Sequence, residues 1–161
     1  MPDLKFAASL QELMSIEQVS SMSGLEFLQG IIDGKHPAPP MAKTLNFRLH
    51  AIERGIACFR GVPEFDYCNP LGTVHGGWYG TILDSAMACS IQTMLEKGAI
   101  YTTLEYKINI TRSIPLGTAV ECTGTVQHFG RKTGVSEGRI VGVEDGKTYA
   151  TGSTTCIILP S

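Results

Sequence analysis

The chain has 161 residues, of which 43% are hydrophobic and 17% are charged, and its formal net charge is −2. This length and composition fit one globular domain and exclude a disordered chain. The scattered lysines and arginines form no basic stripe or polybasic run, which argues against a nucleic-acid or membrane-surface partner.

The N-terminal part of the chain predicts two helices. Residues 4–19 fit a short amphipathic helix. Ser23 fits the N-cap of a second helix over residues 24–33, whose apolar side chains form one stripe and which ends at Gly34.

A proline-rich run at residues 36–40 follows these helices. Proline is excluded from helix interiors and central strands, so the run interrupts regular structure. It is too short to link two independent domains. We therefore predict an N-terminal helical extension at residues 1–35 attached to a main domain at residues 36–161.

The middle of the chain predicts two strands, a loop and one long helix. Residues 41–61 read as two strands that join near residues 51–53. Residues 65–73 are rich in proline, glycine, asparagine and aspartate, which favours a loop. The long helix is predicted over residues 76–96, with Gly98 ending it.

After Gly98, apolar and polar residues alternate, which is the pattern of half-buried antiparallel strands. Four such strands are predicted, at residues 102–111, 119–129, 134–144 and 147–159. Together with the two earlier strands they predict an α+β fold. An antiparallel sheet of about six strands would curl round the one long helix and bury both.

The five cysteines are odd in number, and no two form a CxxC pair. They predict reduced, buried thiols and no zinc site.

No apolar run reaches the roughly 20 residues that cross a bilayer. The first residues also lack a secretory signal. We therefore expect a cytoplasmic protein.

Asp84 is the one acidic residue in the apolar stretch at residues 69–95. On a helix it shares a face with small residues, namely Gly77, Gly80, Thr81 and Ala88. Such an aspartate can be solvated or ion-paired. A carboxylate among apolar groups instead has a raised basicity, which makes Asp84 a candidate general base or nucleophile.

His75, Gly76 and Gly77 open the same helix. They are either a simple helix entry with a capping histidine or an anion site, where free N–H groups would hold an acyl carbonyl oxygen. Gly76 and Asp84 are eight residues apart, which is about 12 Å along a helix. A shared site therefore requires two antiparallel helices across a two-fold axis, and we expect a homodimer or a dimer-of-dimers tetramer.

The run from Asn69 to Gly77, followed by Asp84 within Thr-Ile-Leu-Asp-Ser-Ala, resembles the hotdog-fold acyl-CoA thioesterases. The closest group is the phenylacetate-degradation and 4-hydroxybenzoyl-CoA type. The resemblance extends over about residues 40–159. It implies the hotdog fold and hydrolysis of an aryl- or fatty acyl-CoA to free acid and CoA, without a metal or an organic cofactor.

The resemblance also implies a role for single residues. Asp84 stands where the family has its catalytic carboxylate, acting as a nucleophile or as the base that activates water. Gly76 stands where a backbone N–H polarises the thioester carbonyl, and His75 supports that turn. Asn69 matches a loop residue that holds the thioester or the water. Thr103 matches a hydroxyl near the water.

Further candidates contact the substrate. Thr102 could exchange places with Thr103 through a bulge. The other candidates are Gly77 at the helix entry, Trp78 in the acyl pocket, and Arg112, Arg131 and Lys132 at the CoA phosphates. The tryptophan fits interface packing equally well, and the three cations fit solvated surface charges.

Two other functions remain open. One is a non-catalytic acyl-CoA-binding hotdog protein. The other is an enoyl-CoA hydratase that uses His75 and Asp84 as an acid–base pair. The nine-residue separation of that pair on one helix counts against the second function.

Overall fold

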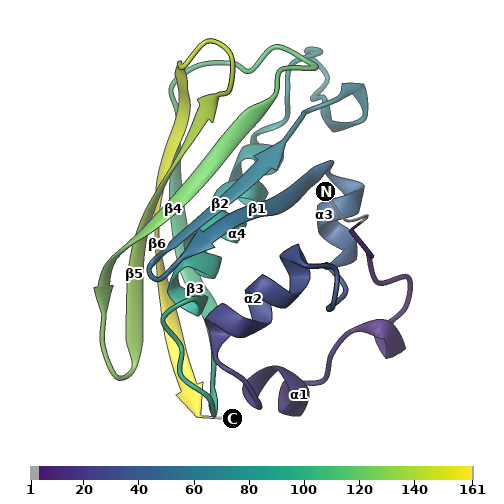
Figure 1. Ribbon diagram of the computed structural model, residues 1–161. Helices are drawn as coiled ribbons and strands as arrows, with labels where there is room; N and C mark the ends of the chain where they lie inside the picture. Colours follow the sequence, from purple (N-terminus) through teal and green to yellow (C-terminus); the bar gives the residue numbers. More distant parts are fainter. Residues whose placement is uncertain (1–3, 161) are drawn as a thin grey trace.

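A computed structural model describes residues 4–160 and shows a curved sheet with one long helix against it (Figure 1). The helix is α4 (Gly76–Gln92). The six strands are β1 (Phe47–Glu53), β2 (Ile56–Gly61), β3 (Ala99–Ile110), β4 (Val120–Phe129), β5 (Thr133–Gly142) and β6 (Thr148–Pro160). Their order is β1-β2-β4-β5-β6-β3, and every neighbouring pair is antiparallel. The predicted α+β hotdog architecture is confirmed.

The core lies between α4 and the sheet. Ile82, Leu83 and Ala86 of α4 are fully buried there. The helix and β4 approach each other closely, because a Cβ at Gly124 would lie 2.3 Å from the carbonyl oxygen of Ala86. Only glycine permits that approach, so it fixes the height of α4 above the sheet.

The N-terminal region contains a 3₁₀ helix, η1 (Leu10–Glu12), and three α-helices: α1 (Ile16–Ser20), α2 (Gly24–Ile32) and α3 (Pro40–Thr44). The helix α2 matches the prediction, and Ser23 caps it by accepting a hydrogen bond from the Glu26 amide at 3.3 Å. Leu28 and Ile31 of α2 belong to the same buried cluster as the α4 side chains. The N-terminal region therefore packs onto the main core.

The predicted helix over residues 4–19 is wrong. Residues 5–7 are extended, because Ala7 donates a backbone hydrogen bond to Ala38 at 3.0 Å and Ala38 donates one to Lys5 at 2.8 Å. Ser15 then accepts a hydrogen bond from the Gln18 amide and starts α1 afresh. Pairing with a distant segment thus replaces the continuous local helix.

The predicted strand start at residue 41 is also wrong, because residues 40–44 form α3. Pro40 occupies the first position of this helix, where its missing N–H costs nothing. The turn between β1 and β2 lies at Arg54 and Gly55, later than predicted, and Gly55 has a φ of 81°. Glycine adopts that left-handed conformation without strain.

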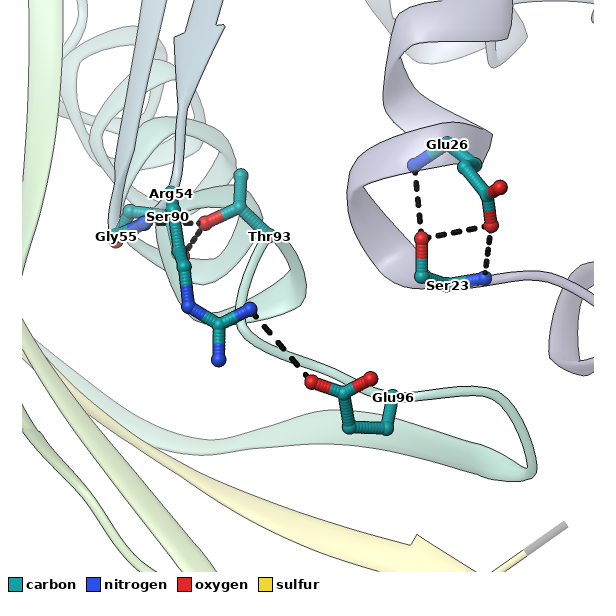
Figure 2. A network of polar contacts seen from close by, with 7 residues as sticks. All are labelled: Ser23, Glu26, Arg54, Gly55, Ser90, Thr93 and Glu96. Carbon is teal, nitrogen blue, oxygen red and sulfur yellow. Dashed lines mark hydrogen bonds and ion pairs between the residues drawn. The ribbon is translucent and has the colours of Figure 1, made fainter.

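The helix α4 ends at Gln92, four residues earlier than predicted. The Thr93 hydroxyl donates to the Ser90 carbonyl at 2.6 Å and accepts from the Gly55 amide at 2.7 Å, as Figure 2 shows. An exposed ion pair between Arg54 and Glu96 lies beside this contact. The end of α4 is therefore tied to the β1–β2 turn. Within residues 4–160, no helix is both long and apolar enough to span a membrane.

Candidate active site

His75 is the N-cap of α4. Its Nδ1 atom accepts a hydrogen bond from the Gly77 amide at 2.9 Å, and its own amide donates to the Tyr67 carbonyl at 2.8 Å. A ring nitrogen that accepts a hydrogen bond carries no proton, so the neutral imidazole has its proton on Nε2. The structure thus gives His75 the capping role, which supports the turn and occupies one of its two ring nitrogens.

Gly76 is the first residue of α4 and is partly exposed. In the part of the chain that the structure describes, its backbone N–H donates to no acceptor. A Cβ placed on Gly76 would have one neighbour within 4 Å, the Cδ1 atom of Ile110 at 3.6 Å. The first turn therefore presents a donor at the positive end of the helix dipole, with room for a ligand atom beside it.

Asn69 organises the loop before α4. Its side-chain oxygen accepts from the amides of Leu71 at 2.9 Å and Thr73 at 3.2 Å, and its side-chain nitrogen donates to the Thr73 hydroxyl at 2.8 Å. These bonds hold the loop from Asn69 to Thr73. Within one chain the Asn69 amide group is thus engaged by its own loop, and its predicted contact with the thioester or water stays a prediction.

Asp84 and Thr103 are brought together by α4 and β3. The Thr103 hydroxyl donates to the Oδ1 atom of Asp84 at 3.1 Å. Burial raises the pKa of Asp84 above its ordinary value, and the Thr103 hydrogen bond offsets part of that rise. Among the described residues, no cation forms a salt bridge with Asp84. Within residues 4–160 Asp84 is therefore not a structural ion-pair partner, and its basicity is raised.

The other hydroxyls on the same face of α4 do not bind Asp84. Thr81 donates to the Gly77 carbonyl and Ser85 donates to the Thr81 carbonyl, both at 2.8 Å. Gly80 lies under Tyr106 of β3, whose hydroxyl oxygen would be 3.2 Å from a Cβ at that glycine. The small-residue face is therefore partly covered within the chain, and the stretch around Gly77, Thr81 and Asp84 remains accessible.

Asp84 lies on the wall of a cavity of about 520 Å³. Thr102 and Thr103 both line this wall. Of the two, Thr103 is the residue that binds Asp84. The register of β3 against β6 shifts between Thr103 and Glu105, which marks a β-bulge at Leu104. Bulges re-aim side chains, and this one follows directly after the residue that binds Asp84.

Cys89 and Tyr101 also line this cavity. Burial raises the pKa of Cys89 to about 12, so its thiol is protonated at neutral pH. The thiolate is the reactive form of cysteine. Cys89 is therefore not an activated thiol.

The family assignment follows from a match over residues 71–149 to the thioesterase superfamily model, which spans the α4 entry, Asp84 and Thr103. Over these residues the chain is similar to the thioesterase superfamily. This places it among thioester hydrolases, and the hotdog fold described above agrees with that class.

Solved structures with the same fold agree with this assignment. A phenylacetic acid degradation-related protein of Ralstonia eutropha JMP134 is 28% identical, with a TM-score of 0.74 over 81% of this chain and 98% of its own. The PaaI protein of E. coli is 21% identical, with a TM-score of 0.75 over 86% and 98%. The smu.793 protein of Streptococcus mutans UA159, bound to acetyl CoA, is 23% identical, with a TM-score of 0.66 over 72% and 90%. No curated protein sequence matches significantly.

The two predicted halves of the site, Gly76 and Asp84, lie apart in one chain. Gly76 and Asp84 belong to the same uninterrupted helix, so about 12 Å of helix rise separates them. A thioester carbonyl polarised by the Gly76 amide therefore lies out of reach of the Asp84 carboxylate of the same chain.

The structure places Trp78 in the core of the thioesterase instead of an acyl pocket. Its side chain is 2% exposed, and its indole N–H donates to the Leu45 carbonyl at 2.9 Å. Trp78 also packs edge-on against Tyr79. The sequence could not decide this, because residues on both faces of the first turn of α4 are apolar or small.

The predicted phosphate-binding cations are exposed and lie at two ends of the sheet. Arg131 and Lys132 form the β4–β5 turn, and the next residue, Thr133, pairs with Ile157, which pairs with Thr102. This turn is thus two strand spacings, about 10 Å, from Thr102. Arg112 follows the far end of β3, near the start of α4. The three cations therefore do not form one cluster.

Part of the cavity wall comes from N-terminal residues, none of which was predicted as a site residue from the sequence. Val19 of α1 and Phe27 of α2 line the cavity that contains Asp84. The only sequence signal was an apolar stripe on the second helix, which is typical of ordinary core packing.

Proposed function

We propose that this thioesterase hydrolyses an aryl- or fatty acyl-CoA thioester to the free acid and CoA. Asp84 of one subunit acts as the base or nucleophile, and the Gly76 amide of its partner donates to the carbonyl oxygen. No metal or organic cofactor takes part. The main support for this proposal is the position of Asp84. Its half-buried carboxylate accepts a hydrogen bond from Thr103 and lies on the wall of a cavity, beside an accessible stretch of α4. The acetyl CoA bound by the Streptococcus mutans relative supports the acyl-CoA class.

The chemistry follows from these two groups. As a base, Asp84 takes a proton from water, and the oxygen of that water attacks the carbonyl carbon. As a nucleophile, its carboxylate attacks the carbon directly, the CoA thiolate leaves to give an anhydride, and water then cleaves that anhydride. In both routes negative charge develops on the carbonyl oxygen, where the N–H at the start of α4 stabilises it. The C–S bond then breaks and CoA leaves as the thiolate.

A second copy of the chain is proposed to complete the site. β3 is an edge strand of the sheet and leaves Leu104 58% and Tyr106 47% exposed. The prediction that the apolar side chains of β3 are buried is therefore wrong for a single chain. A long edge strand with exposed apolar side chains favours pairing with another strand. We propose that β3 pairs with its two-fold copy, so that the helices α4 lie antiparallel and each Gly76 approaches the opposite Asp84.

The CoA phosphates are proposed to contact Arg131 and Lys132. Their turn lies on the side of the sheet that carries Thr102, within the reach of a CoA molecule whose thioester is at Asp84. Arg112, near the start of α4, is proposed as a further contact from the subunit that supplies Gly76. The protein is proposed to act in the cytoplasm, where its five free thiols stay reduced.

The direct test is release of free thiol from acetyl-, phenylacetyl- and dodecanoyl-CoA. The proposal expects turnover of at least one of them by metal-free protein in the presence of a chelator. Tight binding without thiol release would instead indicate an acyl-CoA-binding protein. Hydration of an enoyl-CoA with the thioester intact would indicate a hydratase.

The pH dependence of kcat/KM is expected to follow Asp84. The ionised form of Asp84 is the active one, so activity should rise with pH as the carboxyl group loses its proton. Because burial raises the pKa of Asp84, the midpoint of this acid limb should lie above about 3.9, the value for an ordinary aspartate. Thr103→Val removes the hydrogen bond that lowers this pKa, so the acid limb should move to higher pH. Thr103→Ser keeps the hydroxyl and should keep the limb in place. If the acid limb of Thr103→Val stays at the wild-type pH, the Thr103 hydrogen bond does not control the pKa of Asp84.

A further inference from the structure

The N-terminal segment, residues 4–42, is tied to the body of the protein at several points. Gly98 donates a backbone hydrogen bond to Ser20 at 2.9 Å, and Gly24 donates one to Leu95 at 3.0 Å. A Cβ at Gly24 would lie 1.8 Å from the Gln92 carbonyl oxygen, so α2 abuts the end of α4 directly. The segment loops out at one side of the sheet and returns at α3 (Figure 1). The segment is therefore an ordered part of the fold.

This segment encloses the cavity that reaches Asp84. The polar lining of the cavity includes Asp84, Ser85, Thr102 and Thr103. The N-terminal segment contributes apolar side chains from its loops and helices, among them Leu13, Met14, Val19, Phe27, Leu28 and Met41. Arg48 and Asp84 are the only charged residues among the described residues that line it. One chamber thus joins a reactive carboxylate to an extended apolar lining.

The size and lining favour a flexible aliphatic chain. The cavity has a volume of about 520 Å³. A cavity of about 150 Å³ holds a benzene ring, so an aryl group would leave most of this chamber empty. Methionine adapts to the shape of its neighbours, and Met41 is 56% exposed at the chamber, where an acyl chain would cover it.

We infer that residues 4–42 form an acyl-chain chamber that selects a medium- or long-chain fatty acyl-CoA over short-chain and aryl substrates. This inference rests on the proposed thioesterase function. The thioester lies at Asp84 and Thr103, and the chain extends from there along Val19 and Phe27. The segment lies outside residues 71–149, so selectivity is set by a part of the chain beyond the matched superfamily region.

The test compares kcat/KM for acetyl-, phenylacetyl- and dodecanoyl-CoA, with the last kept below its micelle concentration. Burial of the extra methylene groups should make dodecanoyl-CoA at least about a hundredfold better than acetyl-CoA. Val19→Trp fills the chamber and should lower the dodecanoyl value at least tenfold, with about the same acetyl value. Ile16→Trp is the matched control, because Ile16 lies on the same helix but is 64% exposed and lines no part of the chamber. Met14→Trp is a second filling variant should Val19→Trp unfold.

Failure of the inference and failure of the function give different results. Thiol release that is fastest from acetyl- or phenylacetyl-CoA, or equal losses on all substrates in both filling variants, would overturn the chamber but keep the thioesterase. Absence of thiol release from every substrate would overturn the proposed function. In that case calorimetry still decides the chamber. Dodecanoyl-CoA should bind more tightly than CoA to the wild type and lose that advantage in Val19→Trp, and equal binding of the two ligands would overturn it.

Discussion

Asp84→Asn is expected to lower kcat by about 10²- to 10⁴-fold, the usual contribution of a general base. The amide has the size of the carboxylate and still accepts the Thr103 hydrogen bond, but it neither removes a proton from water nor attacks the thioester. Thiol release from the best acyl-CoA measures the loss. Asp33→Asn, which changes an exposed carboxylate at the end of α2, is the control. Near-normal turnover of Asp84→Asn would remove Asp84 from the mechanism.

The same variant should fold at least as stably as the wild type. Burial raises the pKa of Asp84 in the folded state, so its ionisation opposes folding. That cost is absent below the unfolded-state pKa of about 3.9 and develops as the pH rises through the folded-state pKa. Asparagine removes it. The melting temperature of Asp84→Asn should therefore equal or exceed that of the wild type at pH 8, and the difference should vanish near pH 3.

Gly76→Pro is expected to lower kcat by about 10²- to 10³-fold, as removal of one oxyanion donor does in other acyl-transfer enzymes. Proline lacks the backbone N–H that is proposed to bind the carbonyl oxygen. It is nevertheless well tolerated at the first position of a helix, which Gly76 occupies. His75 before it has φ −64° and ψ 139°, an extended conformation that suits the residue before a proline. The variant should thus lose activity and keep its stability.

Gly76→Ala is the matched control for this change. It keeps the N–H, and its added Cβ would meet only the Ile110 Cδ1 atom at an ordinary contact distance of 3.6 Å. Its kcat should stay within a few-fold of the wild type, since the donor is unchanged. Equal losses in Gly76→Pro and Gly76→Ala would show that space, and not the N–H, matters at this position. Melting curves of both variants check that α4 is intact.

The parts of the fold that the sequence predicted are those with strong local signals. Ser23 as an N-cap predicted the start of α2, and the period-two pattern after Gly98 located the later strands. The failures lie where distant contacts decide the outcome. Residues 5–7 pair with Ala38, so the first predicted helix is interrupted. Pro40 starts a short helix where an extended chain was expected.

The candidate site divides in the same way. The spacing of Gly76 and Asp84 on one helix follows from the sequence alone, and the structure keeps that helix uninterrupted. The contact of Thr103 with Asp84 depends on how β3 crosses α4, and the family resemblance implied only that this hydroxyl lies near the water. The chamber wall from α1 and α2 had no sequence signal, because apolar stripes look alike in a core and in a ligand cavity.

The central claim is that one subunit supplies the Gly76 amide and the other supplies Asp84. Co-refolding equal amounts of the Gly76→Pro and Asp84→Asn proteins tests it most directly. Random pairing in a two-fold assembly gives about one quarter of all shared sites an intact amide and an intact carboxylate. The mixture should therefore recover about a quarter of wild-type thiol release per subunit, although each variant alone is nearly inactive. A mixture no more active than the separate variants, with mixed assemblies present, would place both groups in one chain and contradict the account.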